Sequence, residues 1–181
     1  MTPAYTPAPE LLLQAQGIRV AIFDVDGVLT DGRLYYGAEG EQLKCFHTLD
    51  GLGLKLLQDA GITVAMVSGR DSPALRTRLG ALGVTHARLG VAHKLEPAEA
   101  LLAQLGSTWD ATAVMGDDWP DLPLLQRAHF ACAPANAHLE VRAAVHHVTQ
   151  RSGGAGAARE FCDLLLAASG SYRRLLERHL G

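Results

Sequence analysis

Short apolar runs alternate along the chain with longer segments in which leucines recur at helical spacing, and this alternation limits the possible folds most strongly. Runs with the length of buried strands occur at 19–24, 62–67, 86–90 (the weakest), 111–115, 129–133 and 145–149. The segments between them end near glycines such as Gly61, Gly83 and Gly106, as helices commonly do. Alternating strands and helices form a parallel sheet with right-handed crossovers and helices on both faces. The sequence therefore predicts a doubly wound α/β fold.

The segment 32–47 interrupts this alternation. It has aromatic and apolar residues on both sides of a Gly-Ala-Glu-Gly stretch, which indicates a small β-hairpin flap inserted after the first strand. Residues 1–17 contain three prolines and are expected to form a loose N-terminal arm. We expect a single domain over 18–169 and a C-terminal tail over 170–181. Within the domain, SGGAGAARE at 152–160 is expected to be a flexible loop that leads into the last helix.

Composition and charge exclude several classes of protein. The 181 residues, 48% hydrophobic and 19% charged, are typical of one globular domain with a sizeable core. The net charge of -3 and the scattered arginines give no basic surface for nucleic acid, and no run of eighteen apolar residues is present to cross a membrane. Cys45, Cys132 and Cys162 lie far apart without a C-x-x-C pattern. We therefore expect reduced thiols, a cytoplasmic protein, and neither nucleic acid nor membrane as partner.

Polar residues follow three of the expected strands at the point where each strand ends. Together with a lysine that begins the helix before the third of these strands, they are Asp24, Asp26, Ser68, Gly69, Arg70, Lys94, Asp117, Asp118 and Asp121. In open α/β sheets, ligands bind outside the carboxyl ends of the strands. The sequence therefore predicts that these acids, the hydroxyl group and the lysine converge at one edge of the sheet.

The chemistry of this set indicates phosphoryl transfer. Carboxylates that lie close together repel one another unless a cation lies among them, and oxygen ligands favour a hard ion such as Mg²⁺. The cation, Lys94, the Ser68 hydroxyl and backbone N–H groups would stabilise the charge of a phosphoryl group. One carboxylate can then attack phosphorus to form an aspartyl phosphate, while a second acts as acid and base. Asp24 and Asp26 fit these two roles, because a turn after the strand brings alternate side chains together.

These residues resemble the motifs of the haloacid dehalogenase superfamily of phosphatases: an Asp-x-Asp-x-(Thr/Val) loop, a Ser or Thr after the second strand, a lysine and a Gly-Asp-Asp-x-x-Asp loop. The resemblance implies a Rossmann-like fold with Asp24 as nucleophile and metal ligand. It implies Asp26 as acid and base, with its backbone carbonyl on the metal. The remaining implied roles are phosphoryl binding by Ser68, Gly69 and Lys94, metal ligation by Asp117, and support of the metal site by Asp118 and Asp121.

Longer stretches resemble a narrower family, the 3-deoxy-D-manno-octulosonate 8-phosphate phosphatases of lipopolysaccharide biosynthesis. The similar stretches, which cover about residues 18–169, are FDVDGVLTDG, GEQLKCFHTLDGLGLKLL, VSGRDSPALRTRLGALGV, GDDWPDLPLL and VTQRSGGAGAARE. The resemblance implies Mg²⁺-dependent hydrolysis of the phosphate of an eight-carbon 2-keto-3-deoxy sugar acid. Arg70 and Arg78 match two arginines of this family, and we expect them to bind the substrate carboxylate.

The resemblance also implies a chain without a cap domain. About forty residues separate Asp26 from Ser68, which is too few for a separate cap, so the hairpin flap has to take that place. In this family such hairpins pack together at the centre of a homotetramer. The same assembly here would bury the exposed aromatic residues of the hairpin, which are Tyr35, Tyr36 and Phe46.

Several alternatives remain at this stage. Leu49 stands where many relatives carry an arginine, and Trp119-Pro120 replaces smaller or aliphatic residues, so a nine-carbon ulosonate 9-phosphate or a broader range of sugar phosphates are alternative substrates. A phospho-acceptor signalling module would carry the acid pair on the first strand and the acceptor on the third, which is a different order. A catalytically silent interaction module would have lost Asp24 or Asp26. No role is assigned to the eight histidines.

Overall fold

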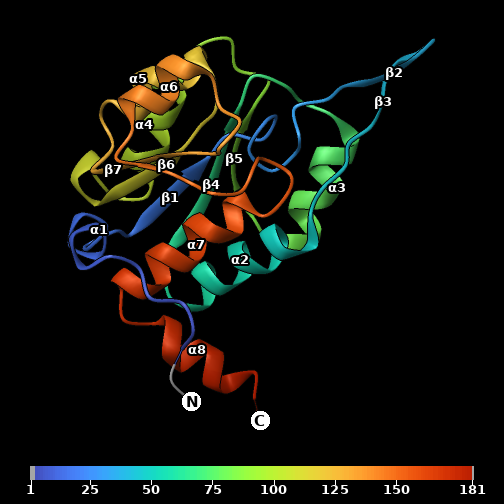
Figure 1. Ribbon diagram of the computed structural model, residues 1–181. Helices are drawn as coiled ribbons and strands as arrows, with labels where there is room; N and C mark the ends of the chain where they lie inside the picture. The colour runs from blue at the N-terminus through green and yellow to red at the C-terminus, as the bar shows by residue number, and fades with distance from the viewer. Residues whose placement is uncertain (1–2, 181) are drawn as a thin grey trace.

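A parallel sheet of six strands forms the centre of the protein, with helices on both of its faces (Figure 1). The computed structural model describes residues 3–180. In chain order the strands are β1 Val20–Phe23, β4 Thr63–Ser68, β5 His86–Leu89, β6 Thr112–Met115, β7 Phe130–Ala133 and β8 His147–Val148. Their order across the sheet is β5-β4-β1-β6-β7-β8, so the direction of winding reverses at β1. The doubly wound α/β fold predicted from the sequence is confirmed.

The helices cover the two faces of the sheet and enclose two separate apolar cores. On one face lie α1 Pro9–Gln14, α2 Thr48–Asp59, α3 Pro73–Leu82, α7 Ala157–Ala168 and α8 Tyr172–Arg178. On the other face lie α4 Leu95–Gln104, α5 Leu122–Leu125 and α6 Leu139–Ala144. Strand β1 contributes to both cores, because Ala21 and Phe23 belong to the first and Val20 and Ile22 to the second. Burial on both sides explains why its sequence is continuously apolar.

The predicted hairpin is present as strands β2 Tyr35–Gly37 and β3 Gly40–Leu43, which pair in antiparallel fashion. It extends away from the sheet and the helices, as Figure 1 shows. No cap domain occurs among residues 3–180. The three cysteines are free thiols. None of the helices in the described part of the chain is both long enough and apolar enough to cross a membrane.

Both ends of the chain contain helices that contact the domain. In the segment expected as an N-terminal arm, Leu11 and Leu12 of α1 pack against the first core, and the ring of Tyr5 lies 5.5 Å from that of Tyr172. In the segment expected as a tail, Leu175 of α8 is buried. Residues 1, 2 and 181 lie outside the described part of the chain.

The glycine-rich segment before α7 packs directly against the loop that follows β1. Gly154 donates a backbone hydrogen bond to the carbonyl of Val28, at 3.0 Å, and Gly153 donates to Asn136 Oδ1 at 2.8 Å. A Cβ atom on Gly153 would collide with the backbone carbonyl of Gly27, and Gly154 has a φ of +66°. The interpretation of 152–160 as a flexible loop missed this backbone-to-backbone contact, which requires glycine at both positions.

The close approach at Gly153 gives a test by substitution. We expect Gly153→Ala to lower the free energy of unfolding by about 1–3 kcal/mol, because either this segment or the loop after β1 must move. Gly80→Ala is the matched control, since Gly80 lies in α3 with open space around its Cβ position, and it should raise stability by about 0.5–1 kcal/mol. Urea unfolding of both variants measures the difference, and equal stabilities would contradict the assignment.

Candidate active site

A cleft of about 550 Å³ opens at the carboxyl edge of the sheet, where the order of the strands reverses. Ligand sites of doubly wound folds commonly lie at this position. The structure brings nine of the ten predicted site residues to this cleft, and these are Asp24, Asp26, Ser68, Gly69, Arg70, Lys94, Asp117, Asp118 and Asp121. The tenth, Arg78, is not among the residues that line it.

The loop after β1 fixes the positions of the first two aspartates. The backbone N–H of Asp24 donates to the carbonyl of Met115 on β6, at 2.9 Å, which continues the pairing of the two strands. The chain then turns, and the N–H groups of Leu29 and Thr30 donate to the carbonyl of Val25. The turn places Asp24 and Asp26 in the same cleft, as the alternation of side chains predicted.

Lys94 and Asp121 hold the acidic loop against β1. The ammonium group of Lys94 is buried and lies 2.8 Å from Asp24 Oδ1 and 2.6 Å from Asp121 Oδ1. The other oxygen of Asp121 accepts backbone hydrogen bonds from Asp117, at 3.0 Å, and Asp118, at 3.3 Å. Asp121 therefore stabilises the acidic loop, while the Asp118 carboxylate caps the turn by accepting a hydrogen bond from the backbone of Trp119. Their predicted role in supporting a metal site stays a prediction.

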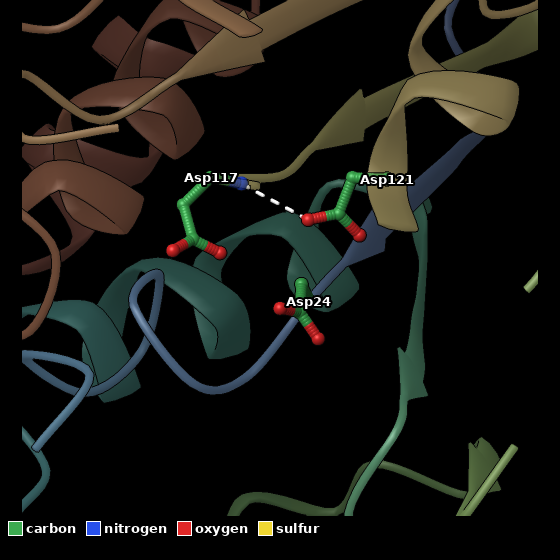
Figure 2. Close-up of side chains that lie close together, drawn as sticks. All are labelled: Asp24, Asp117 and Asp121. Atoms are coloured by element: carbon green, nitrogen blue, oxygen red, sulfur yellow. Dashed lines mark hydrogen bonds between the residues drawn. The ribbon is translucent and has the colours of Figure 1, made fainter. Parts of the chain in front are cut away.

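Three carboxylates meet next to this ion pair. Figure 2 shows Asp24, Asp117 and Asp121 around one space, and each offers an oxygen within 4.8 Å of the others. Burial and the charge of Asp121 raise the pKa of Asp24 from 3.8 to about 6, although Lys94 opposes the shift. Burial and the charges of Asp24 and Asp121 raise the pKa of Asp117 to about 8. This oxygen-only cluster, with more negative charge than Lys94 can balance, fits a hard divalent cation.

The wall of the cleft on the β4 side carries the predicted phosphoryl-binding residues. Ser68 ends β4 and is buried, with its hydroxyl oxygen accepting a hydrogen bond from the backbone of Arg70 at 3.3 Å. Gly69 is exposed beside it. The Arg70 side chain is 43% exposed at the rim, and its guanidinium donates to the hydroxyl of Tyr36 on the hairpin at 3.2 Å.

Arg78 lies at the base of the hairpin rather than in the cleft. Its guanidinium group lies over the ring of Phe46, 5.8 Å from the centroid, and donates to the backbone carbonyl of His47 at 3.5 Å. Phe46 itself is half-buried and packs against the first core. A role for Arg78 in binding the substrate carboxylate stays a prediction.

The sequence reasoning missed Lys44. Its ammonium group lies 2.5 Å from Asp26 Oδ1 and 2.9 Å from Glu41 Oε1. Burial lowers the pKa of Lys44, but its hydrogen bonds to Asp26 and Glu41 and their charges outweigh this effect, so the pKa is raised and the side chain is charged. A single lysine in an exposed hairpin carries no signal in the sequence, because most such lysines are solvated.

The fold and this cleft define the class of protein. A family model described as haloacid dehalogenase-like hydrolase matches residues 90–161. The chain is 48% identical over 155 residues to the 3-deoxy-D-manno-octulosonate 8-phosphate phosphatase of Haemophilus influenzae, with 86% of each chain covered. The phosphatase of the same name from Yersinia pestis is 40% identical over 161 residues, covering 89% of this chain and 86% of that one.

Solved structures agree in fold and in sequence. A probable YrbI family phosphatase from Pseudomonas syringae pv. phaseolica has a TM-score of 0.93 and 42% identity, with 96% of this chain and 99% of that chain covered. A second structure is that of the 3-deoxy-D-manno-octulosonate 8-phosphate phosphatase of Moraxella catarrhalis in complex with a magnesium ion, a phosphate ion and KDO. It has a TM-score of 0.91 and 35% identity, with 96% of this chain and 99% of that chain covered.

The fold and cleft are thus those of a haloacid dehalogenase-like hydrolase, and the enzyme class is phosphoric monoester hydrolase. At identities of up to 48% over most of its length, the chain belongs to the family of 3-deoxy-D-manno-octulosonate 8-phosphate phosphatases. The resemblance recognised in the sequence motifs is confirmed.

Without metal, the free energy of unfolding should depend on pH, because the pKa of Asp117 is raised in the folded protein. Because this pKa is about 8 in the folded protein against an ordinary 3.8, the folded state binds more protons between these values, and stability falls as the pH rises. In EDTA we therefore expect Asp117→Asn to melt at a higher temperature than the wild type at pH 8. The difference between their melting temperatures should shrink towards pH 4. Calorimetric melts of both proteins across this range measure it.

At pH 8, magnesium should reverse the order of the two melting temperatures, so that the wild type melts above Asp117→Asn. A bound cation offsets the repulsion and stabilises the wild type by roughly 2.7 kcal/mol when free metal is a hundredfold above its Kd. Asp117→Asn should gain much less. Asp110→Asn is the control, because Asp110 is exposed, precedes β6 at the opposite end of the strand and does not line the cleft, so it should leave the response to metal unchanged. A wild-type melting temperature that ignores both Mg²⁺ and EDTA would contradict a cation site here.

Proposed function

We propose that this protein is a Mg²⁺-dependent phosphatase that hydrolyses 3-deoxy-D-manno-octulosonate 8-phosphate to the free sugar acid and phosphate. The observation that carries the proposal is the cluster of Asp24, Asp117 and Asp121 beside the buried Lys94, because this set suits a metal and a phosphoryl group together. The proposed substrate is the one for which the relatives are named. The magnesium, phosphate and KDO in the Moraxella catarrhalis structure support both the metal and the substrate of this proposal.

Asp24 is the nucleophile in this proposal. One of its oxygens attacks phosphorus, and the new O–P bond forms as the ester P–O bond breaks, which gives an aspartyl phosphate. Lys94 has three N–H donors, two of which face Asp24 and Asp121, so the third is free for a phosphoryl oxygen. The Ser68 hydroxyl and the Gly69 backbone N–H line the same cleft and would bind the other oxygens.

Asp26 acts as acid and then as base. It gives a proton to the leaving alkoxide oxygen as the ester bond breaks, and later takes a proton from the water that attacks the aspartyl phosphate. The second attack releases inorganic phosphate and returns Asp24 as a carboxylate. Asp24, Asp117 and the backbone carbonyl of Asp26 would hold the metal. When bound, Mg²⁺ would offset negative charge on the phosphoryl oxygens and the aspartates.

The sugar acid would lie against the open rim of the cleft. Arg70 is available there to bind a carboxylate, for which a planar guanidinium group is well suited. Leu49, at a position where the family resemblance led us to expect an arginine, is 42% exposed, and Trp119 is 59% exposed in the acidic loop. These two differences keep a nine-carbon ulosonate 9-phosphate as a second candidate substrate.

The decisive experiment measures phosphate release from a panel of sugar phosphates, with Mg²⁺ and with EDTA. We expect metal-dependent turnover with a clear preference for the eight-carbon acid over the nine-carbon acid. Asp24→Asn should abolish turnover, and Asp26→Asn should lower it about 10²–10⁴-fold. Asp31→Asn is the control from the same motif, since Asp31 is exposed and does not line the cleft, and it should keep normal activity. Full activity in either of the first two variants would refute the assigned roles.

We further propose a homotetramer that buries the hairpin. The exposed apolar side chains on it are Leu34, Tyr35, Tyr36 and Leu43, with exposed fractions from 38% to 63%. The hairpin extends from the body of the domain, so the domain itself does not cover these side chains. We expect other copies of the chain to cover them.

Two substitutions in the hairpin test this assembly. We expect Tyr36→Ser combined with Leu43→Ser to shift the sedimenting species from tetramer to smaller forms, because it removes the two most exposed apolar groups of the hairpin. Leu139→Ser is the control, since Leu139 is 71% exposed but lies on α6, away from the hairpin. Analytical ultracentrifugation measures the distribution, and a wild-type monomer would contradict the proposal.

A further inference from the structure

The hairpin places a lysine against the aspartate that the proposed mechanism uses as acid and base. Lys44 follows β3, where the hairpin returns to the body of the domain, and only 1% of its side chain is exposed. Its neighbours Leu43 and Cys45 are both exposed, so the burial is particular to Lys44. A buried ammonium group is costly unless groups of opposite charge compensate it.

Two carboxylates compensate this charge from different parts of the chain. Lys44 donates a hydrogen bond to Asp26 Oδ1 at 2.5 Å, and its nitrogen lies 2.9 Å from Glu41 Oε1. Glu41 belongs to β3, so this pair is internal to the hairpin. Asp26 belongs to the loop after β1 that also carries Asp24. The contact between Lys44 and Asp26 therefore links the hairpin to the catalytic loop.

The second oxygen of Asp26 accepts no hydrogen bond from any side chain within residues 3–180. Asp26 Oδ2 lies 3.9 Å from Arg70 Nε, which is beyond hydrogen-bond distance, and Arg70 is part of the cleft wall. While Lys44 holds Oδ1, rotation of the carboxyl group is restricted, and Oδ2 is the oxygen left to exchange a proton with the substrate. A misplacement of a reacting group by about 1 Å can cost roughly 10²-fold in rate.

We propose that Lys44 is a positioning residue for Asp26, and that contact of the hairpin with the catalytic loop sets the geometry of proton transfer. The inference rests on the proposed function of Asp26. Lys44 does not line the cleft, so it acts through Asp26 and not on the substrate. A lysine that merely anchored the hairpin would matter equally for every substrate, whereas a positioning residue matters only where Asp26 must transfer a proton.

The nature of the leaving group separates these two roles. An alkoxide leaves only if Asp26 protonates it, whereas p-nitrophenolate is stable as an anion and leaves without a proton. The value of kcat/KM reports the steps up to loss of this group, so it isolates the first half of the reaction. The two substrates are p-nitrophenyl phosphate and the sugar phosphate that the wild type hydrolyses best.

We expect Lys44→Met to lower kcat/KM for the sugar phosphate by about 10²-fold and to change kcat/KM for p-nitrophenyl phosphate much less. Glu41→Gln is the matched control, because it removes the other ion pair of Lys44 and leaves the contact with Asp26. Glu41 Oε2 also lies 3.9 Å from Arg70 Nη1 at the rim, so this variant should change kcat/KM for the sugar phosphate only weakly, far less than Lys44→Met, and leave kcat/KM for p-nitrophenyl phosphate unchanged. The hairpin keeps a second link to the cleft through Tyr36 and Arg70, so it need not detach in either variant.

Two results would overturn the inference. An equal loss of kcat/KM on both substrates in Lys44→Met would make Lys44 an anchor, and wild-type values on both would remove any role. If Lys44→Met does not fold, Lys44→Gln, which keeps a neutral donor, carries the same comparison. Failure of the proposed function is a separate result, because the wild type would then release phosphate from neither substrate, and the inference would fall with it.

Discussion

Mutual repulsion among three carboxylates is the constraint on which the rest of this structure depends. Asp24, Asp117 and Asp121 offer oxygens within 4.8 Å of one another, and Lys94 supplies the only buried ammonium group in contact with any of them within residues 3–180. Burial, together with this repulsion, raises the pKa values of Asp24 and Asp117. A protein keeps such a cluster only where a ligand repays the cost of this repulsion, and here a cation and a phosphoryl group would do so.

The sheet supplies the rigidity that holds the cluster together. Strand β1 is buried on both faces and pairs with β4 and β6, and the hydrogen bond from Asp24 to Met115 extends this pairing into the catalytic loop. Asp121 uses both of its oxygens, one on Lys94 and one on the backbone of the acidic loop. The acids are therefore held by strand pairing, by hydrogen-bonded turns and by the buried Lys94, which favours preorganised catalysis.

The loop after β1 is also supported from two sides by segments distant in sequence. Gly153 and Gly154 pack against its backbone at one side, and Lys44 of the hairpin holds Asp26 at the other. The described residues contain no cap domain, and the hairpin contacts the rim of the cleft through the hydrogen bond between Tyr36 and Arg70. A single small element then has two tasks, to shape the rim through Tyr36 and Arg70 and to contact the proposed acid and base.

The sequence by itself determined the fold class, the hairpin and most of the cleft. Buried parallel strands must be continuously apolar, so the polar residues at their carboxyl ends, such as Asp24, Ser68 and Asp117, were visible as a set. Tertiary structure alone decided the contacts made by residues whose sequence surroundings are ordinary. Lys44 carried no signal in the sequence and Gly153 was interpreted as part of a flexible loop, yet Lys44 contacts Asp26 and Gly153 packs against Gly27. Such contacts depend on how distant segments pack, and local patterns do not carry that information.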